Sequence, residues 1–468
     1  MLGGFCIYKN KLVRSLKGGI TVDVNTINPK VGHRKIGDFY TLYHCGTQEL
    51  QTLNETGSLI WACLLEGLST EAIGQRISAS HNVSVTEATE DAEIFIEDLR
   101  REGYLGNKVP APDGVDNYES GGYDALLDLE LRAIEGLVPF AATFEVTYSC
   151  NEKCVHCYMD RTGSRLSLTK IKDILDQLAE AGCLFVSFTG GELFTRGDAL
   201  EIIHHASSKN FVIDVLSNGT LIDEGVCRAL ESCSVRRVQV SIYGSNEVCH
   251  DRITQLPGSL TKTTTAIRLL RNHGIKVEVA FPMMQGNFDQ RYDVRELAIS
   301  MGCEFSPSPY ITARNDGSQD TFAMRITDEQ LRQFLSDPEL AMNYAGRKPF
   351  EEHQFYFGFS DLRDAPPCYS GFNSVAINPD GIVLPCNQFL LPLGDLKETG
   401  FRQIWSSEPA EMLREVRIGN LEVCPSCTSL AQCTRCPGLA MLEGGSMLGP
   451  SPENCRVVKI SQTIEEGR

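Results

Sequence analysis

Short apolar runs alternate with helical patterns in the middle of the chain, and this alternation restricts the possible folds more than any other feature. Six runs of β-branched and aromatic residues lie between residues 141 and 306, namely TFEVT, LFVSF, FVIDVLS, RVQVS, IKVEVAF and CEFS. Segments with helical spacing, such as SLTKIKDILDQLAEAG, separate them. Such βα units predict an α/β protein with a parallel sheet, either open or closed into a partial (βα)6 barrel. Functional side chains in these folds gather at the carboxyl ends of the strands, where the loops converge.

Composition excludes several classes of function. The 468 residues include 43 Lys and Arg against 61 Asp and Glu, a net charge of −18, and an acidic chain repels phosphate backbones. No stretch approaches the ~20 apolar residues that a membrane span needs. The N-terminus MLGGFCIYKNKLVR lacks the apolar core of a signal peptide. We therefore expect a cytoplasmic protein with neither nucleic acid nor a membrane as partner.

Cysteine is unusually frequent, with 18 residues. In a reducing compartment so many thiols indicate metal or redox chemistry rather than disulfides. The run TFEVT leads into Cys150, Cys154 and Cys157, a C-x3-C-x2-C spacing. Three thiolates fit one side of a [4Fe–4S] cube and leave one iron open for a substrate or cofactor. The alternatives are a zinc loop without a nearby fourth ligand and a coincidental spacing.

This motif and the loops after the following strands resemble the radical S-adenosylmethionine (SAM) enzymes. In that family the open iron binds SAM, and reductive cleavage yields a 5′-deoxyadenosyl radical that removes a hydrogen atom. The second strand ends in a GGE turn, the third in Ser-Asn-Gly and the fourth in Ser-Ile-Tyr-Gly, while Leu193 stands where the family often has Pro. The resemblance implies SAM contacts by His156, Gly190, Gly191, Glu192, Ser217, Asn218, Ser241 and Arg252.

A second cysteine group resembles the seven-cysteine SPASM extension of radical SAM enzymes. The interval between Cys433 and Cys436 is often one residue longer in that family. The resemblance implies two further [4Fe–4S] clusters, three in all: auxiliary cluster I on Cys368, Cys386 and Cys436, and auxiliary cluster II on Cys424, Cys427, Cys433 and Cys455. A zinc ribbon is the alternative, but its C-x2-C pairs are ~15–20 residues apart, whereas five residues intervene here.

Auxiliary cluster I lacks an evident fourth ligand, because no cysteine lies between Cys303 and Cys368. Its remaining iron is then either open or bound by Asp361, Asp364 or another loop residue. An open iron could bind a substrate cysteine thiolate and accept its electron while a bond forms.

The first 106 residues predict a separate domain. Short β-like runs lie between residues 20 and 53 (ITVDV, KIGDFYTLYHC and ELQTL). Three helical patterns follow, and their predicted starts are Asn54 or Thr56, Ser69 or Thr70, and Thr86. From Leu53 onward the segment resembles the PqqD-like precursor-recognition domain of ribosomal-peptide maturation systems, a small winged-helix fold to which a leader peptide adds a strand. A DNA-reading winged helix is the alternative, but its last helix has more acids than bases.

We therefore predict a recognition domain at residues 1–106, a linker at 107–140, a radical SAM barrel at 141–345 and a SPASM domain at 346–468. The predicted function is maturation of a ribosomal precursor peptide, with an electron donor such as flavodoxin or ferredoxin. A thioether between a Cys sulfur and a carbon, the sactipeptide type, is the preferred product. The alternatives are C–C or ether links, another radical modification, formylglycine formation by an anaerobic sulfatase maturase, and a non-enzymatic zinc protein. No motif identifies a general base.

Overall fold

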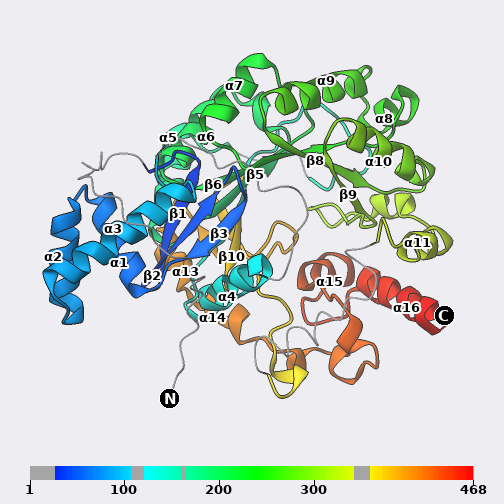
Figure 1. Ribbon diagram of the computed structural model, residues 1–468. Coiled ribbons are helices and arrows are strands. Elements are labelled where there is room, and N and C mark those ends of the chain that lie inside the picture. Colours follow the sequence, from blue (N-terminus) through cyan, green and yellow to red (C-terminus); the bar gives the residue numbers. More distant parts are fainter. Residues whose placement is uncertain (1–26, 107–120, 160–164, 342–358, 467–468) are drawn as a thin grey trace.

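The computed structural model describes residues 27–106, 121–159, 165–341 and 359–466. Figure 1 shows a small N-terminal domain beside a large sheet with helices on its outer side, and a C-terminal region of short elements. The expected strand ITVDV and the predicted domain and linker segments at 1–26, 107–120 and 342–358 lie outside the described residues, so the domain boundaries stay predictions. No helix within the described ranges is long and apolar enough to cross a membrane.

The N-terminal domain combines an antiparallel sheet, in the order β1-β2-β3, with three helices. Its elements are β1 (Val31–Ile36), β2 (Phe39–His44), β3 (Glu49–Thr52), α1 (Glu55–Leu65), α2 (Thr70–His81) and α3 (Val85–Arg101). The expected run KIGDFYTLYHC contains the turn between β1 and β2, where Gly37 has a φ of 60° that glycine adopts without strain. One face of the sheet packs on the helices around Leu42, Trp61 and Ile73.

Capping side chains fix the starts of these helices. Asn54 Oδ1 accepts a hydrogen bond from the Gly57 N–H at 2.7 Å, and Ser69 Oγ accepts from the Ala72 N–H at 3.3 Å. These bonds satisfy amide groups that have no partner within the helix, and they confirm the expected starts of the first two helices. The expected start of the third helix at Thr86 is wrong, because Ser84 caps the helix and its first residue is already Val85.

Six parallel strands in sequence order form the central sheet, as the βα alternation predicted. They are β4 (Ala141–Thr147), β5 (Phe185–Gly190), β6 (Val212–Ser217), β7 (Arg237–Ser241), β8 (Lys276–Pro282) and β9 (Glu304–Ser308). The helices of this region are α5 (Leu168–Glu180), α6 (Ala199–Ser208), α7 (Glu224–Ser232), α8 (Glu247–Thr254), α9 (Ser259–Asn272), α10 (Arg291–Ser300) and α11 (Asp328–Leu335).

Alternate residues of β4 define the two faces of this sheet. Phe144 and Val146 are fully buried and belong to the same core as Ile171 and Leu175 of α5. Because successive side chains of a strand point to opposite faces, Glu145 projects to the other, inner face. The barrel interior therefore receives a carboxylate from the strand that leads into the first cysteines.

The C-terminal region extends the same sheet beyond β4. The strand β10 pairs in parallel with β4, and two antiparallel strands complete the order β12-β11-β10-β4-β5-β6-β7-β8-β9. The elements of this region are β10 (Ser374–Ile377), β11 (Ile382–Leu384), β12 (Gly394–Asp395), α13 (Phe401–Trp405), α14 (Glu408–Glu415), α15 (Pro437–Gly444) and α16 (Pro452–Glu466). This pairing places loops of the second cysteine group beside the strand that precedes the first group.

The second half of the predicted linker is a helix rather than an irregular segment, namely α4 (Gly121–Glu135). Leu129 of α4 packs with Tyr43 of β2 and with Leu184 and Val212 of the barrel. Leu184 directly precedes β5, and Val212 is the first residue of β6. The N-terminal domain therefore docks at the amino ends of the barrel strands, as Figure 1 shows.

Candidate functional site

The loop after β4 brings the first three cysteines together. Cys154 Sγ donates to Glu152 Oε2 at 3.3 Å, and Cys150 Sγ accepts from the Glu152 N–H at 3.4 Å. Burial raises the pKa of the Cys154 thiol, and the charges of Glu152, Cys157 and Cys150 add to the rise. A bound metal centre reverses this effect because its positive charge stabilises thiolates. The three thiols thus form a donor set that fits a cluster at the carboxyl end of the sheet.

Two distant segments hold this cysteine loop in place. The Val155 N–H donates to the carbonyl of Ile253 in α8 at 3.0 Å. The guanidinium of Arg314 donates to the carbonyls of Cys157 at 2.6 Å and Val155 at 3.3 Å. Arg314 belongs to no recognisable motif, so the sequence analysis did not find this contact.

Gly190 and Gly191 end β5 directly against the cysteine loop. A Cβ atom at Gly190 would lie 2.2 Å from the Thr147 carbonyl oxygen, and one at Gly191 would lie 2.2 Å from the Ser149 carbonyl oxygen. Gly190 also has a φ of 123°, which residues with a side chain rarely adopt. The close approach of the two backbones therefore requires glycine at both positions.

Glu192 is completely buried, and both of its carboxylate oxygens have partners within the protein. The Ser217 hydroxyl lies 3.0 Å from Oε1 and 2.9 Å from Oε2, and the Asn218 N–H donates to Oε2 at 2.8 Å. Burial raises the pKa of this carboxyl, and the hydrogen bonds oppose the rise. Three predicted site residues thus form one group that joins the carboxyl ends of β5 and β6, while their contacts with SAM stay predictions.

His156 and Ser241 both contact Tyr243, whereas Arg252 contacts the Gly286 carbonyl. The rings of His156 and Tyr243 have centroids 4.9 Å apart, and the Ser241 side chain hydrogen-bonds to Tyr243. Burial lowers the pKa of His156 to about 4, so its ring is neutral near pH 7. Arg252 is exposed on α8 and donates to the Gly286 carbonyl at 3.0 Å.

Three loops of the C-terminal region bring together Cys368, Cys386 and Cys436, the members of the second cysteine group that were predicted to hold auxiliary cluster I. Burial raises the pKa of the Cys436 thiol to about 11, and the charges of Cys368 and Cys386 add to the rise. Each sulfur accepts a backbone hydrogen bond, at 3.4 Å from Ser370, 3.5 Å from Gln388 and 3.5 Å from Leu439. Hydrogen bonds of this kind tune the potential of iron–sulfur clusters.

The aspartates considered as fourth ligands of this group have other surroundings. The Asp361 carboxylate accepts from the Arg363 guanidinium at 2.6 to 3.1 Å, and Asp364 is exposed. Burial raises the pKa of the Cys386 thiol, and the charges of Cys368 and Glu145 add to the rise. Glu145 of β4 is therefore an acidic side chain whose charge acts on this group.

Cys424, Cys427, Cys433 and Cys455 line one pocket. Burial raises the pKa of Cys433 to about 12, and the other three thiols add to the rise. Cys427 is exposed, so this group reaches the surface. Among the described residues, no three His, Cys, Asp or Glu side chains converge on one metal ion.

Glu145 lies between the cysteines of the loop after β4 and the set of Cys368, Cys386 and Cys436, and the sequence analysis missed it. Glu145 is 2% exposed. Its Oε1 accepts a hydrogen bond from the Tyr158 hydroxyl at 3.1 Å, and its Oε2 accepts one from the Tyr148 hydroxyl at 3.3 Å. Burial raises the pKa of its carboxyl to about 7, although both hydrogen bonds lower it. The available signal was one acidic residue in the apolar run TFEVT.

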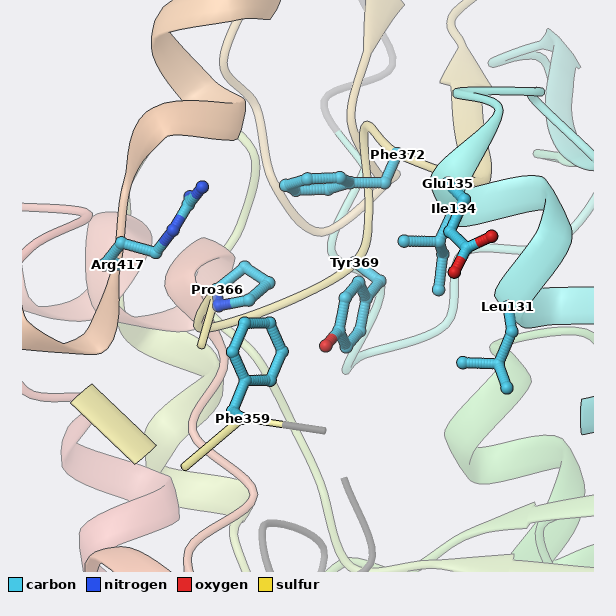
Figure 2. Close-up of a pocket in the computed structure, with 8 residues that line it drawn as sticks. All are labelled: Leu131, Ile134, Glu135, Phe359, Pro366, Tyr369, Phe372 and Arg417. Carbon is cyan, nitrogen blue, oxygen red and sulfur yellow. The ribbon is translucent and has the colours of Figure 1, made fainter. Parts of the chain in front are cut away.

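A separate cavity of about 240 Å³ lies between α4 and the loop after Cys368. Figure 2 shows side chains of α4 on one side and Tyr369 and Phe372 on the other. The complete lining is Leu131, Ile134, Glu135, Phe359, Pro366, Tyr369, Phe372 and Arg417. Because Tyr369 directly follows Cys368, this mostly apolar cavity adjoins the second cysteine group.

Comparison with known families matches three parts of the chain. Residues 40–105 match coenzyme PQQ synthesis protein D (PqqD), residues 144–298 match the radical SAM superfamily, and residues 368–437 match the SPASM iron–sulfur cluster-binding domain. These matches fall in the N-terminal domain, the barrel and the C-terminal region. The radical SAM and SPASM domains imply [4Fe–4S] clusters and SAM as cofactors.

Three proteins illustrate the range of similarity. The chain is 29% identical over 284 residues to the antilisterial bacteriocin subtilosin biosynthesis protein AlbA of Bacillus subtilis, covering 58% of this chain and 60% of AlbA. It is 23% identical over 337 residues to an AdoMet-dependent heme synthase of Methanosarcina barkeri, covering 67% of this chain and 95% of that protein. Streptococcus suis SuiB bound to the precursor peptide SuiA has a TM-score of 0.59 at 16% identity, covering 92% of this chain and 99% of SuiB.

Proposed function

Because the chain carries PqqD, radical SAM and SPASM domains, we propose that it modifies a ribosomally synthesised precursor peptide by radical SAM chemistry. The observation that carries this proposal is the grouping of the cysteine thiols into three sets, in each of which the thiols lie close enough for their charges to interact. The name of AlbA, a bacteriocin biosynthesis protein, and the complex of SuiB with a precursor peptide support a peptide as substrate.

We assign one [4Fe–4S] cluster to each set, three in all. Cys150, Cys154 and Cys157 would hold the SAM cluster, which together with SAM supplies a 5′-deoxyadenosyl radical when both are bound. Cys368, Cys386 and Cys436 would hold auxiliary cluster I, and Cys424, Cys427, Cys433 and Cys455 auxiliary cluster II. An electron donor such as flavodoxin or ferredoxin would supply the reducing electron.

SAM would lie against the carboxyl ends of β5, β6 and β7. Its contacts would come from Gly190, Gly191, Glu192, Ser217, Asn218, Ser241 and His156, with Arg252 more distant on α8. The chain's own part in this binding is to keep the backbone of β5 and the cysteine loop in contact. Arg314 contributes by fixing the carbonyls of Val155 and Cys157.

The leader of the precursor would bind at the N-terminal sheet. Within the described residues, β3 pairs with β2 alone and stands at an edge of that sheet. The opposite edge strand, β1, is close to the barrel, because a Cβ atom at Gly32 would lie 2.5 Å from the Val212 side chain. An edge strand offers unpaired amide and carbonyl groups to a peptide in extended conformation. Both edges of this sheet are therefore candidates for the leader, and β3 also contacts α4.

A thioether between a Cys sulfur and a carbon is our proposed product. Its support is the set of three thiols for auxiliary cluster I, which leaves a position for a substrate thiolate. The similarity to an AdoMet-dependent heme synthase gives a second candidate function, heme synthesis. The PqqD domain at residues 40–105 favours the peptide.

The test is anaerobic incubation of the reconstituted enzyme with SAM, dithionite and a candidate precursor peptide, sought as a short open reading frame next to the gene for this chain. We expect 5′-deoxyadenosine and a peptide that loses two hydrogens per link. Protection of the linked Cys from iodoacetamide would identify a thioether, whereas an alkylated Cys with the same mass loss would identify a C–C or ether link. Release of 5′-deoxyadenosine with an unmodified peptide would refute the proposal.

A further inference from the structure

We propose that Glu145 is the proton acceptor of the crosslinking reaction, an assignment that rests on the function proposed above. Its carboxylate lies where the SAM-cluster loop and the loops of auxiliary cluster I meet. In the proposed reaction the substrate contacts both regions, which makes the buried carboxylate at their junction, in a residue that is 2% exposed, the candidate acceptor.

Side chains from both regions converge on this carboxylate. Tyr158, which directly follows Cys157, donates to Oε1 at 3.1 Å and also hydrogen-bonds to Asn387, the neighbour of Cys386. Tyr148 donates to Oε2 at 3.3 Å and hydrogen-bonds to Asn378, which directly follows β10. Two tyrosines thus hold the carboxylate between the two cysteine groups.

The surroundings of Glu145 suit a base. Burial raises the pKa of its carboxyl to about 7, and within the described part of the chain the opposing contributions come from the hydroxyl groups of Tyr158 and Tyr148. The groups that face it are Tyr148 and Tyr158 of the cysteine loop, the paired Thr189 of β5, Asn378 with the nearby Asp380, and Cys386 with Asn387. Each carboxylate oxygen accepts one tyrosine hydroxyl, so each retains capacity for a further hydrogen bond.

Loss of two hydrogens per link requires a proton acceptor. One hydrogen leaves as an atom with the 5′-deoxyadenosyl group, and the other leaves the substrate thiol as a proton. Formation of the S–C bond would release one electron, for which an oxidised auxiliary iron–sulfur cluster held by the C-terminal cysteines would be the acceptor. Glu145 would take the proton, and its protonated form is stable near neutral pH because the site is buried.

Two variants separate this role from a structural one. Glu145→Gln keeps the size and one acceptor oxygen but takes up no proton, whereas Glu145→Asp keeps a carboxylate. Both reconstituted holoenzymes are compared with the wild type for iron content, for the EPR spectra of their clusters, for 5′-deoxyadenosine and for linked peptide. Infrared difference spectra between pH 6 and pH 8 report the protonated carboxyl band directly, independently of turnover.

We expect Glu145→Gln to keep its clusters and cleave SAM but to link peptide ~100-fold or more slowly, as loss of a general base typically does. Glu145→Asp should retain linking, with a rate that falls at low pH as in the wild type. The carboxyl band that titrates near pH 7 should disappear in Glu145→Gln.

The proposal would be overturned if Glu145→Gln linked peptide as fast as the wild type. It would also be overturned if both variants lost linking equally while their clusters stayed intact. A changed cluster spectrum in Glu145→Gln would overturn it as well, because Glu145 would then be a cluster ligand or a support of the loop. A wild type that cleaves SAM without linking peptide would instead refute the proposed function.

Discussion

Replacing Gly191 with alanine should displace the cysteine loop and slow SAM cleavage. A Cβ atom at this position would lie 2.2 Å from the Ser149 carbonyl oxygen, 2.7 Å from its carbonyl carbon and 2.8 Å from the Tyr148 oxygen. Ordinary contact distances begin at 3.4 Å, so one backbone must move by just over 1 Å. All three neighbours are backbone atoms of the loop that carries Cys150, so no flexible side chain can absorb the shift.

The magnitude follows from this displacement. Overpacking of this kind costs about 1–3 kcal/mol of stability, and a displacement of about 1 Å at a reacting site costs about 100-fold in rate. We expect Gly191→Ala to form 5′-deoxyadenosine about 100-fold more slowly than the wild type in anaerobic assays with SAM and dithionite. Urea unfolding of the same preparation measures the loss of stability.

Gly197→Ala is the matched control, because it adds the same methyl group a few residues further along the chain. A Cβ atom at Gly197 meets nothing within 4 Å, so this variant should match the wild type within about twofold in rate and about 0.5 kcal/mol in stability. If Gly191→Ala cleaved SAM as fast as Gly197→Ala, the close approach of the two backbones would not position the SAM cluster, and our reasoning would fail.

Three further outcomes are expected. Cys433→Ala should lose about four irons per chain, while Cys183→Ala, which changes a buried thiol far from the three sets, should retain them in an iron assay. Folding raises the pKa of Glu145 from 4.5 to about 7, so the folded state binds an extra proton between these values and stability falls as pH rises. The free energy of unfolding of Glu145→Gln should therefore rise relative to that of the wild type between pH 5 and pH 8, by up to about 3 kcal/mol in urea unfolding of the apoprotein. A difference in unfolding free energy that did not change with pH would contradict this. Gly32→Val should clash with Val212, which a Cβ atom would approach to 2.5 Å, and weaken docking of the N-terminal domain; peptide linking should fall while peptide-independent SAM cleavage is unchanged.

The sequence predicted those features whose signals are local. Six apolar runs predicted six parallel strands, because strand length and helical spacing are visible within short windows. Asn54 and Ser69 were each one of two candidate starts, since a capping side chain acts on an amide group only three residues away, and both are the caps in the structure. The third helix was predicted to start at Thr86, whereas Ser84 caps it and Val85 is its first residue; Ser and Thr can both cap, so residue type alone does not fix the start.

Features that depend on distant contacts were not predictable in this way. Glu145 is one acidic residue in a short strand, and its role depends on Tyr148, Tyr158 and a strand more than 200 residues later. Arg314 contacts the cysteine loop across 157 positions, and no spacing rule connects two such residues. The helix α4 was read as linker because its flanking Gly, Pro and Asp residues dominated the local composition.

Docking of the N-terminal domain at the amino ends of the barrel strands sets a minimum reach for any substrate that this domain captures. Strands of six residues such as β6 are about 20 Å long at ~3.3 Å per residue, and the cysteines stand at their other end. A fully extended peptide covers at most ~3.6 Å per residue, so about six residues must separate the captured segment from the first residue that reacts. A peptide with a shorter spacer would bind to the N-terminal domain, but its reacting residue would not reach the cysteines. In the proposed reaction this distance would therefore determine which residue of the peptide is linked first.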